Sequence, residues 1–235
     1  MIISHKYKFI FIKTSKTAGT STEIALSRYC GDDDVITKNS PEDEIIRNHQ
    51  GGRNPQNHYL SFSEYSGVDW ARLIFKRKRL QLRSHFSASF IRNFTGDAVW
   101  NNYFKFCFER NPWDRTVSLY YHHLQDRKYK KIIGPNISEY ISAGYPEQLR
   151  VRGFYNYTID GKIAVNRVCL YENLEAELEY VCNHILGLPE PLILPRAKGQ
   201  HRKDKRHYRE ILGNEDRDRI AELFTEEIRR FGYSF

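Results

Sequence analysis

The sequence predicts an α/β fold in which helices flank a central, mostly parallel sheet. Residues 9–12 and 103–108 are apolar runs typical of buried strands, and a helical pattern follows each run after a short polar loop. Strands that alternate with helices are typical of a parallel sheet. The 235 residues fit one domain, 1–235, and a hydrophobic content of 40% is enough to form its core.

The first strand leads into a loop rich in lysine, serine and threonine, residues 13–19, and a helix is expected from near Thr20 with Glu23 in its first turn. The free N–H groups and positive dipole end of a helix N-terminus attract anions, and Lys16 adds a cation. The loop is not a Walker A motif, because its lysine precedes its only glycine. We therefore expect a phosphate-like anion other than ATP, although turn formation alone also explains such residues.

The second strand leads to an arginine and a hydroxyl group at the same edge of the sheet. Arg110 follows the strand, Pro112 suits the opening turn of a helix, and Ser118 lies about two turns into that helix. Ligands of open α/β sheets bind at this edge. The apolar face of the helix is predicted to contain Trp113, Val117, Tyr120, Tyr121 and Leu124.

Shorter patterns predict the elements between these two units and after them. Residues 31–69 are polar and are expected to form a long irregular loop with one short helix near 41–48. Another helix is expected to end near Phe94, a hairpin to turn at 160–161, and a strand to occupy 168–171.

Two helices are predicted to complete the fold. The first is capped by Asn173 and ended by Gly187, and its apolar face contains Leu174, Leu178, Val181 and Ile185. The second starts at Asn214 as one continuous helix, and its buried stripe contains Ile220, Leu223, Phe224, Ile228 and Phe231.

Composition indicates the setting of the protein. The net charge of +8 suits an anionic ligand, but it also suits a chain that is merely soluble. No signal peptide or apolar run of about 20 residues is present, so we expect a cytoplasmic protein without a membrane span. The nine histidines show no ligand spacing, and we predict no metal. Core positions in a reducing compartment are predicted for Cys30, Cys107, Cys169 and Cys182.

The two strand–helix motifs resemble those of sulfotransferases that use 3′-phosphoadenosine 5′-phosphosulfate (PAPS). Residues 13–21, Lys-Thr-Ser-Lys-Thr-Ala-Gly-Thr-Ser, resemble the 5′-phosphosulfate loop, and residues 108–118, Phe-Glu-Arg-Asn-Pro-Trp-Asp-Arg-Thr-Val-Ser, resemble the 3′-phosphate motif. Residues 170–174 and 207–233 also fit the carbohydrate O-sulfotransferase branch, which is family 2-like. The resemblance implies a three-layer sandwich like that of P-loop NTPases. It also implies sulfuryl transfer to an acceptor hydroxyl, expected on a saccharide or glycoconjugate, with release of 3′,5′-bisphosphoadenosine (PAP).

The resemblance also implies roles for individual residues. Lys16 would neutralise charge on the leaving group and His85 would act as general base, although His85 could instead cap a helix or pack in the core. His122 and His123 are the rival bases and are expected to be structural. The implied nucleotide-binding residues near the two motifs are Lys13, Ser15, Lys16, Thr17, Ala18, Gly19, Thr20, Ser21, Thr22, Arg110, Ser118 and Tyr171.

Two basic runs allow alternative interpretations. Residues 196–209 either form a loop over the nucleotide or are a solvated charged segment. Residues 76–79, Lys-Arg-Lys-Arg, are either a solvated face or a patch that faces the acceptor, and the 31–69 segment would be an acceptor-side insertion. The nucleotide-side residues of the 196–209 loop would be Lys198, Arg202, Lys205, Arg206 and Tyr208.

Two other functions remain open at this point. A nucleotide-dependent phosphotransferase is disfavoured because the sequence lacks Gly-Lys-Ser/Thr and a clear magnesium-ligand motif. A non-catalytic module that binds polyanions is supported by charge alone. We expect no specific binding of nucleic acid and no metal requirement.

Overall fold

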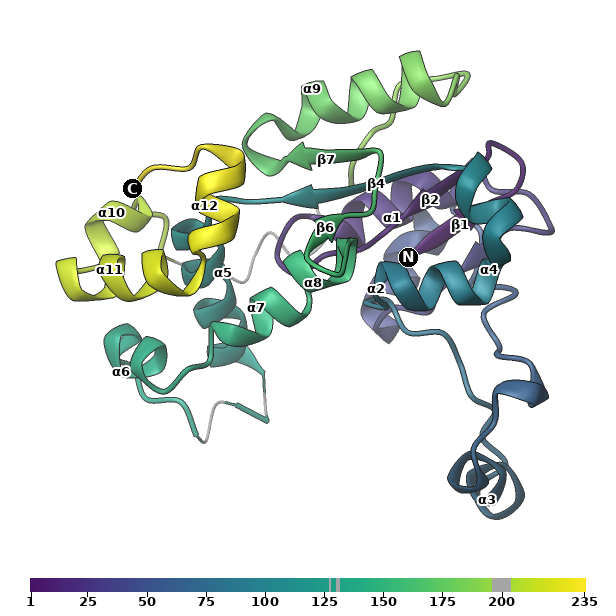
Figure 1. Ribbon diagram of the computed structural model, residues 1–235, viewed down its shortest axis with the longest axis horizontal. Coiled ribbons are helices and arrows are strands. Elements are labelled where there is room, and N and C mark those ends of the chain that lie inside the picture. The colour runs from purple at the N-terminus through teal and green to yellow at the C-terminus, as the bar shows by residue number, and fades with distance from the viewer. Residues whose placement is uncertain (127, 130–131, 196–203) are drawn as a thin grey trace.

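The computed structural model describes residues 1–126, 128–129, 132–195 and 204–235 as a mixed α/β fold (Figure 1). Its central sheet has the strand order β3-β1-β2-β4-β7, in which β2, β4 and β7 are parallel and β1 is antiparallel to β2 and β3. The prediction of a mostly parallel central sheet with flanking helices is therefore confirmed. The strands of the sheet are β1 Ile2–Ser4, β2 Phe9–Phe11, β3 Val35–Ile36, β4 Phe104–Glu109 and β7 Arg167–Leu170.

The α-helices of the described residues are α1 Gly19–Ser27, α2 Pro41–His49, α3 Gly67–Lys76, α4 Ala88–Asn102, α5 Pro112–Gln125, α6 Ile137–Ser142, α7 Glu147–Val151, α8 Phe154–Tyr157, α9 Leu174–Glu179, α10 Tyr208–Ile211, α11 Asn214–Leu223 and α12 Thr225–Phe231. Two short 3₁₀ helices span Phe62–Glu64 and Tyr171–Asn173, and a π-helical segment, Tyr180–Ile185, continues α9.

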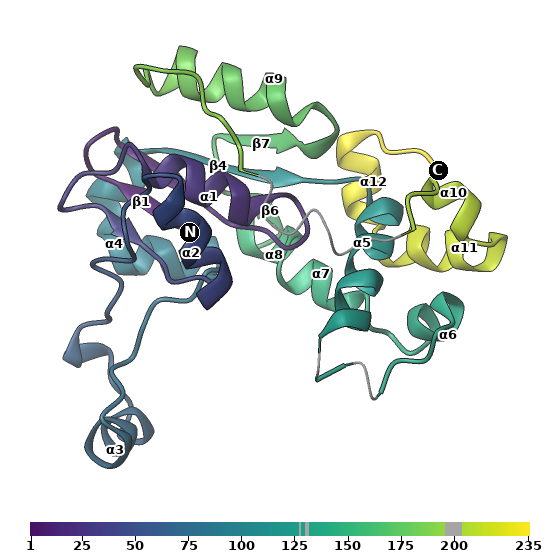
Figure 2. The ribbon, with the colours of Figure 1, turned by 180° about the vertical axis from the view of Figure 1, so that it is seen from behind.

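Alternating side chains along the strands divide the core between the two faces of the sheet. Phe9 and Phe11 of β2 pack in a cluster with residues of α1 and α9, whereas Ile10 packs in a cluster with residues of α4 and α8. Figures 1 and 2 show α9 and α8 on opposite sides of the sheet. Each strand therefore contributes apolar side chains to both faces, as the continuous apolar runs predict.

A third cluster lies beyond the carboxyl end of β4. Trp113 and Val117 of α5 pack there with Tyr208 of α10, with Ile220 of α11 and with Phe224, which lies between α11 and α12. This packing holds the N-terminal part of α5 in place. Since α5 starts three residues after β4 ends, the start of the helix stays close to the end of that strand.

Several predicted elements are confirmed where their capping signals are strong. α5 begins at Pro112, and the side chain of Asn111 accepts hydrogen bonds from the backbone N–H groups of Trp113 and Asp114. The predicted hairpin pairs β5, Thr158–Ile159, with β6, Lys162–Ile163. Residues 160 and 161 have the positive φ angles of a tight hairpin turn, 51° and 72°. All four cysteines are free and buried.

Three helix predictions were wrong in detail. The last helix is broken into α11 and α12 at Phe224, a buried residue with φ −109° and ψ 28°. The helix expected to end near Phe94 continues to Asn102 across a kink at Gly96, whose φ is 77°. Asn173 makes no side-chain cap for α9, and Ile185 is 36% exposed and lies outside the buried face.

The 31–69 segment is more regular than the sequence predicts. The expected helix is present as α2, but β3 also joins the sheet, and Asp34 is buried ahead of it. The Asp34 carboxylate accepts hydrogen bonds from the backbone N–H groups of His5, Lys6 and Gly31, which satisfies this buried charge. The sequence also missed α3, which stands on an arm that extends away from the sheet (Figures 1 and 2).

A buried carboxylate on α12 makes stability depend on pH. Glu227 has no exposed surface, its carboxylate oxygens make no hydrogen bond within the described part of the chain, and Arg150 Nε lies 3.9 Å from Oε1. Burial, together with the nearby Glu109 carboxylate, raises the pKa of Glu227 to about 7. Because this pKa is higher than in the unfolded chain, the folded state loses stability as the pH rises from about 4.5 through about 7.

We expect Glu227→Gln to remove this pH dependence. Relative to the variant, the wild-type free energy of unfolding should fall by on the order of 3 kcal/mol between about pH 4.5 and pH 8, since each pKa unit corresponds to about 1.4 kcal/mol. Urea unfolding of both proteins at the two pH values measures the difference. A constant offset between them would show that Glu227 does not titrate in this range.

Candidate active site

Both sequence motifs and His85 line one cleft with a volume of about 380 Å³. The cleft lies at the carboxyl ends of the three parallel strands: residues 12–18 follow β2, Arg110 follows β4 and Tyr171 follows β7. This is the sheet edge at which α/β folds bind ligands. The predicted site residues that line the cleft are Lys13, Ser15, Lys16, Ala18, Gly19, Thr20, Ser21, His85, Arg110, Ser118 and Tyr171.

The N-terminus of α1 opens into this cleft without a side-chain cap. Its N-cap is Ala18, with φ 58°, which has no polar side chain to accept from the first-turn N–H groups. A Cβ atom on Gly19 would lie 2.8 Å from Lys13 Cγ, so the tight turn into the helix requires glycine. The amides of residues 19–21 are thus arranged for an anionic ligand.

Thr17 and Thr22 do not line the cleft, and their side chains maintain the conformation of the loop. Thr17 is fully buried, its hydroxyl donates to the Thr14 carbonyl oxygen at 3.2 Å, and its Oγ1 lies 2.8 Å from Thr14 Oγ1. The Thr22 hydroxyl donates to the Ala18 carbonyl oxygen at 3.2 Å. Only their backbone groups could contact a ligand in this conformation.

Lys13 lies at the edge of the cleft in a buried ion pair. Its Nζ donates to Glu23 Oε2 at 2.8 Å and to Asn39 Oδ1 at 2.6 Å. Burial would raise the pKa of Glu23, but Lys13, the Met1 amine and Arg47 lower it to about 2. Glu23 lies beyond the first turn of α1, contrary to the prediction. Lys13 shares the Glu23 carboxylate with the Met1 amine and Arg47, and this pairing fixes the loop against α1.

Arg110 connects the two motifs. Its Nε and Nη2 donate to Asp114 Oδ2 at 2.9 and 2.6 Å, and its Nη1 donates to the Lys16 carbonyl oxygen at 2.9 Å. The guanidinium carbon lies 4.1 Å from the centre of the Tyr171 ring, a cation–π contact. Ser118 lies two turns further along α5 and lines the same cleft. An anion that reaches Arg110 would therefore also lie near the first loop.

Arg115, for which no role was predicted, supports the loop at residues 13–19. Its Nε donates to the Ser15 carbonyl oxygen at 2.8 Å, and its Nη1 pairs with the buried carboxylate of Glu109. The Tyr157 hydroxyl donates to the other Glu109 oxygen at 2.7 Å. Arg115 lies within the quoted 108–118 motif, so its position was available from the sequence, but its buried pairing was not.

The His85 ring is oriented by a backbone carbonyl group. Its Nδ1 lies 2.9 Å from the Lys13 carbonyl oxygen, which can only accept, so Nδ1 carries the proton in the neutral ring. Nε2 then holds the free lone pair that a general base needs. Burial, and then the positive charge of Lys13, lower the pKa of His85 to about 3. The ring is therefore neutral near pH 7.

The rival histidines also line the cleft. His123 is buried, its Nδ1 lies 3.0 Å from the Tyr140 hydroxyl, and its ring stacks on Tyr129 at 3.9 Å between centroids. His122 is half-buried beside it. The packing of His123 supports the structural role expected for it.

Arg152 is a cleft residue that the sequence analysis missed. It follows α7 and lines the cleft, and its carbonyl oxygen accepts from the Ser15 N–H at 2.8 Å. No strand or motif precedes it in the sequence, so no local signal marks it. Other cleft residues without a predicted cofactor or catalytic role are Thr14, Leu119, Asp126, Tyr129 and Gln148.

The basic stretch 196–209 is described only in its last part, and Lys198 and Arg202 lie outside the described residues. Lys205 and Arg206 are exposed and do not line the cleft, and Arg206 pairs with Asp204 at 2.7 Å. Asp204 also accepts from the hydroxyl of Tyr121 on α5, which attaches this stretch near the second motif.

Tyr208 is also absent from the lining of the cleft. It is buried, and its hydroxyl accepts from Asn111 Nδ2 at 3.3 Å. It therefore supports the start of α5.

The described residues contain neither a cluster of potential metal ligands nor a helix that could span a membrane. No group of three or more histidine, cysteine, aspartate or glutamate side chains is arranged there to hold a metal ion. None of the helices described is both long and apolar enough to cross a membrane.

Comparison with known proteins identifies the family. The family model described as Sulfotransferase family matches residues 1–234. An uncharacterised protein of Archaeoglobus fulgidus is 32% identical over 103 residues, which cover 43% of this chain and 82% of that protein. No solved structure gives a significant match. Because the family model covers nearly the whole chain, as the two motifs predicted, the protein belongs to the sulfotransferase family, in its family 2 branch.

Proposed function

We propose that the protein transfers a sulfuryl group from PAPS to an acceptor hydroxyl on a carbohydrate. The observation that carries this proposal is the single cleft that contains the α1 N-terminus with Lys16, Arg110 with Ser118, and His85. Membership of the sulfotransferase family supports sulfuryl transfer. The proposal includes PAPS as the donor, a carbohydrate as the acceptor, a P-loop-like role for residues 12–18 and a cytoplasmic setting.

The cleft offers separate contacts for the two anionic ends of this donor. The first-turn amides of α1 and Lys16 suit the 5′-phosphosulfate, because they combine N–H donors with positive charge. Arg110 and Ser118 suit the 3′-phosphate, since a guanidinium group donates two parallel hydrogen bonds to phosphate oxygens. Tyr171, whose ring centre lies 4.1 Å from the Arg110 guanidinium carbon, would contact the adenine.

The same residues support in-line transfer without an obligatory metal ion. His85 Nε2 takes the proton of the acceptor hydroxyl while that oxygen forms a bond to sulfur. The bond from sulfur to the 5′-phosphate oxygen breaks at the same time, and Lys16 neutralises the charge that develops on this oxygen. The sulfuryl group carries one negative charge, so positioning and these cations provide most of the stabilisation.

Calorimetry with PAP and ATP tests the proposed donor class. We expect PAP to bind more tightly than ATP and to remain bound at moderate salt, because buried contacts are screened less than surface charges. Equal or tighter binding of ATP would favour a phosphotransferase. Binding of both nucleotides that disappears at moderate salt would favour a module that binds polyanions without specificity.

Replacing Arg110 by alanine should weaken PAP binding by about 2–4 kcal/mol, the range for truncating a buried charge-assisted contact. Adenosine 5′-phosphosulfate, which lacks the 3′-phosphate, should lose much less affinity. Arg110→Lys is the control. Lysine keeps the positive charge but lacks the guanidinium N–H pairs, one of which donates to Asp114 and another of which would donate to the 3′-phosphate. Equal losses for both nucleotides in calorimetry would show that Arg110 acts only by holding the loop.

A further inference from the structure

The α3 helix stands at the end of an arm, residues 61–81, and buries none of its side chains (Figures 1 and 2). Both ends of the arm are attached to the main body. Leu60 and Leu82 are buried in one core cluster, and the Leu82 N–H donates to the His58 carbonyl oxygen at 2.7 Å. The arm is therefore anchored at its base, whereas α3 contributes nothing to the core.

One face of α3 is apolar and exposed to solvent. Trp70 and Ile74 lie four residues apart, and Val68 and Phe75 lie seven apart, so all four share one side of the helix. Ile74 is 68% exposed and Phe75 is 84% exposed. The exposed ring of Phe62 extends this surface, because it stacks on Trp70 with 5.6 Å between ring centres. A contiguous apolar surface of this kind marks an interaction site.

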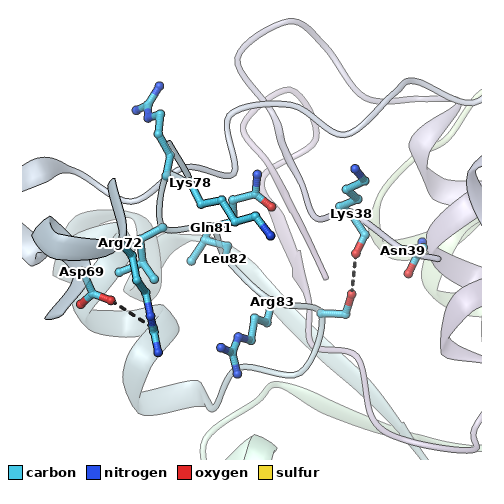
Figure 3. Close-up of a pocket in the computed structure, with 11 residues that line it drawn as sticks. Lys38, Asn39, Asp69, Arg72, Lys78, Gln81, Leu82 and Arg83 are labelled. Atoms are coloured by element: carbon cyan, nitrogen blue, oxygen red, sulfur yellow. Dashed lines mark hydrogen bonds and ion pairs between the residues drawn. The ribbon is translucent and has the colours of Figure 1, made fainter. Parts of the chain in front are cut away.

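The opposite face of α3 is polar and is directed toward the main body. Asp69, Arg72 and Lys76 recur at the spacing of one helix face. Asp69 and Arg72 line a pocket of about 420 Å³ that the loop at residues 38–39 of the main body also lines (Figure 3). Because the polar face borders this pocket, the apolar face is turned away from the main body.

A run of positive charge lies next to the apolar face. Residues 76–79, Lys-Arg-Lys-Arg, complete α3 and follow it, and all four are exposed. No carboxylate of the described residues forms an ion pair with any of them, and the Arg79 guanidinium carbon lies 4.4 Å from the centre of the Tyr59 ring. Five cations against two carboxylates give the arm a net charge of +3. The arm therefore combines an apolar surface with a local excess of positive charge.

We propose that the arm binds the surface of an anionic lipid bilayer. The apolar face of α3 would enter the boundary between headgroups and acyl chains, and residues 76–79 would contact lipid phosphate and carboxylate groups. An amphipathic helix with adjacent basic residues matches this boundary, where acyl chains lie next to anionic headgroups. Aromatic side chains such as Trp70 are favoured at the same depth. The inference is independent of the proposed sulfuryl transfer.

Two other occupants fit the arm less well. A second copy of the chain could cover the apolar face, but it would bring two basic runs close together, and like charges repel. Nucleic acid would match the basic run, but it would leave Ile74 and Phe75 without an apolar partner. A bilayer with anionic headgroups satisfies the charge and the apolar surface together.

Vesicle flotation with the full-length protein tests the proposal. One set of vesicles is phosphatidylcholine alone, and the other contains phosphatidylcholine and phosphatidylserine in a ratio of about 3:1. The protein should bind the anionic vesicles about tenfold or more tightly, because each basic residue near the surface adds attraction, and salt should weaken this preference. Absence of binding to the anionic vesicles, or equal binding to both sets, would overturn the proposal.

The double variant Ile74→Gln, Phe75→Gln tests the apolar contact. It should lose about tenfold or more in binding to the anionic vesicles, because two exposed apolar side chains are removed. The fold should persist, since glutamine is a good helix former, and an unchanged midpoint of thermal unfolding checks this. Ile45→Gln is the matched control, because Ile45 is an exposed isoleucine on α2. Wild-type binding by the double variant would show that α3 does not enter the bilayer.

A second double variant, Lys76→Gln with Lys78→Gln, tests the basic run. Binding to the anionic vesicles should fall by about tenfold or more, while binding to phosphatidylcholine alone should change little. The control is Lys8→Gln with Lys162→Gln, which removes the same charge from exposed positions outside the arm. Equal losses in both variants would assign the binding to the net charge of the protein and overturn the role of the arm.

Trp70 reports insertion directly. Trp100 and Trp113 are buried, whereas Trp70 is exposed. Anionic vesicles with brominated acyl chains should therefore quench the emission of Trp70. Trp70→Phe should still bind these vesicles, since it keeps an aromatic ring, but should lose the quenching. Binding of the wild-type protein without quenching would contradict insertion of α3.

The same variants identify the other occupants. A concentration-dependent dimer that is lost in the Ile74→Gln, Phe75→Gln variant, without vesicle binding by the wild type, would assign the apolar face to a second copy. Duplex DNA that binds more tightly than the anionic vesicles, with a dependence on Lys76 and Lys78 alone, would overturn the assignment to lipid.

Discussion

Replacing Lys16 by alanine is expected to lower the turnover number by about 10²–10³-fold, the usual loss when one group that stabilises transition-state charge is removed. Lys16 lies in the loop between β2 and α1 and lines the cleft beside the uncapped end of α1. Its positive charge stabilises the transition state more than the bound substrate, because negative charge develops on the departing phosphate oxygen in the transition state. The loss should therefore fall mainly on kcat, measured by sulfuryl transfer from PAPS.

The fold should tolerate this change. Lys16 has a positive φ of 64°, but alanine in this conformation is no more strained than lysine, and the Lys16 carbonyl that accepts from Arg110 is retained. Lys8→Ala is a matched control, because Lys8 is an exposed lysine with φ 52° outside the cleft. Near-wild-type turnover in the Lys16 variant, or an equal loss in the Lys8 variant, would remove Lys16 from the mechanism.

The parts of the fold that could be predicted are those with long local signals. β2 with α1 and β4 with α5 each combine an apolar run with the start of a helix, and Asn111 and Pro112 mark the start of α5 directly. These two units carry most of the cleft, so its position at the sheet edge followed from the sequence. The family match was predictable for the same reason, since both motifs lie in these units.

The parts that could not be predicted depend on tertiary contacts. β1 and β3 contain three and two residues, too few to show a period, and they form strands because they pair with a neighbour. The break at Phe224 has no glycine or proline, so only packing explains it. α3 has no buried residue, so no pattern of core residues marks its position in the sequence.

The partners of the charged side chains in the site also depend on tertiary contacts, so they could not be predicted from the sequence. The sequence suggested Lys13 as a nucleotide ligand, but the structure pairs it with Glu23, which lies ten residues later and is buried. Arg115 and Glu109 form a second buried pair under the loop. Residue type and spacing indicate which side chains are near the cleft, whereas burial and partners decide which charges are available to a ligand.

Replacing His85 by alanine is expected to lower the rate of sulfuryl transfer by about 10²–10⁴-fold, the usual range for a general base. PAP affinity should change little, because His85 Nε2 would face the acceptor hydroxyl. His85→Asn is the sharper variant, since its amide can still donate to the Lys13 carbonyl oxygen but offers no basic nitrogen. His122→Ala, in the same cleft, should retain most activity. A fully active His85→Asn enzyme would exclude the ring as the base.

The pH profile gives an independent test of the same role. Burial and the Lys13 charge lower the pKa of His85 to about 3 in the free protein, so kcat/KM should not fall through His85 until the pH approaches that value. The negative charge of bound PAPS favours the imidazolium form and raises this pKa. The fall in kcat on the acid side should therefore occur at a higher pH than the fall in kcat/KM, and it should be absent from the residual activity of His85→Asn. An acid limb that persists unchanged in the variant would assign the proton to another group.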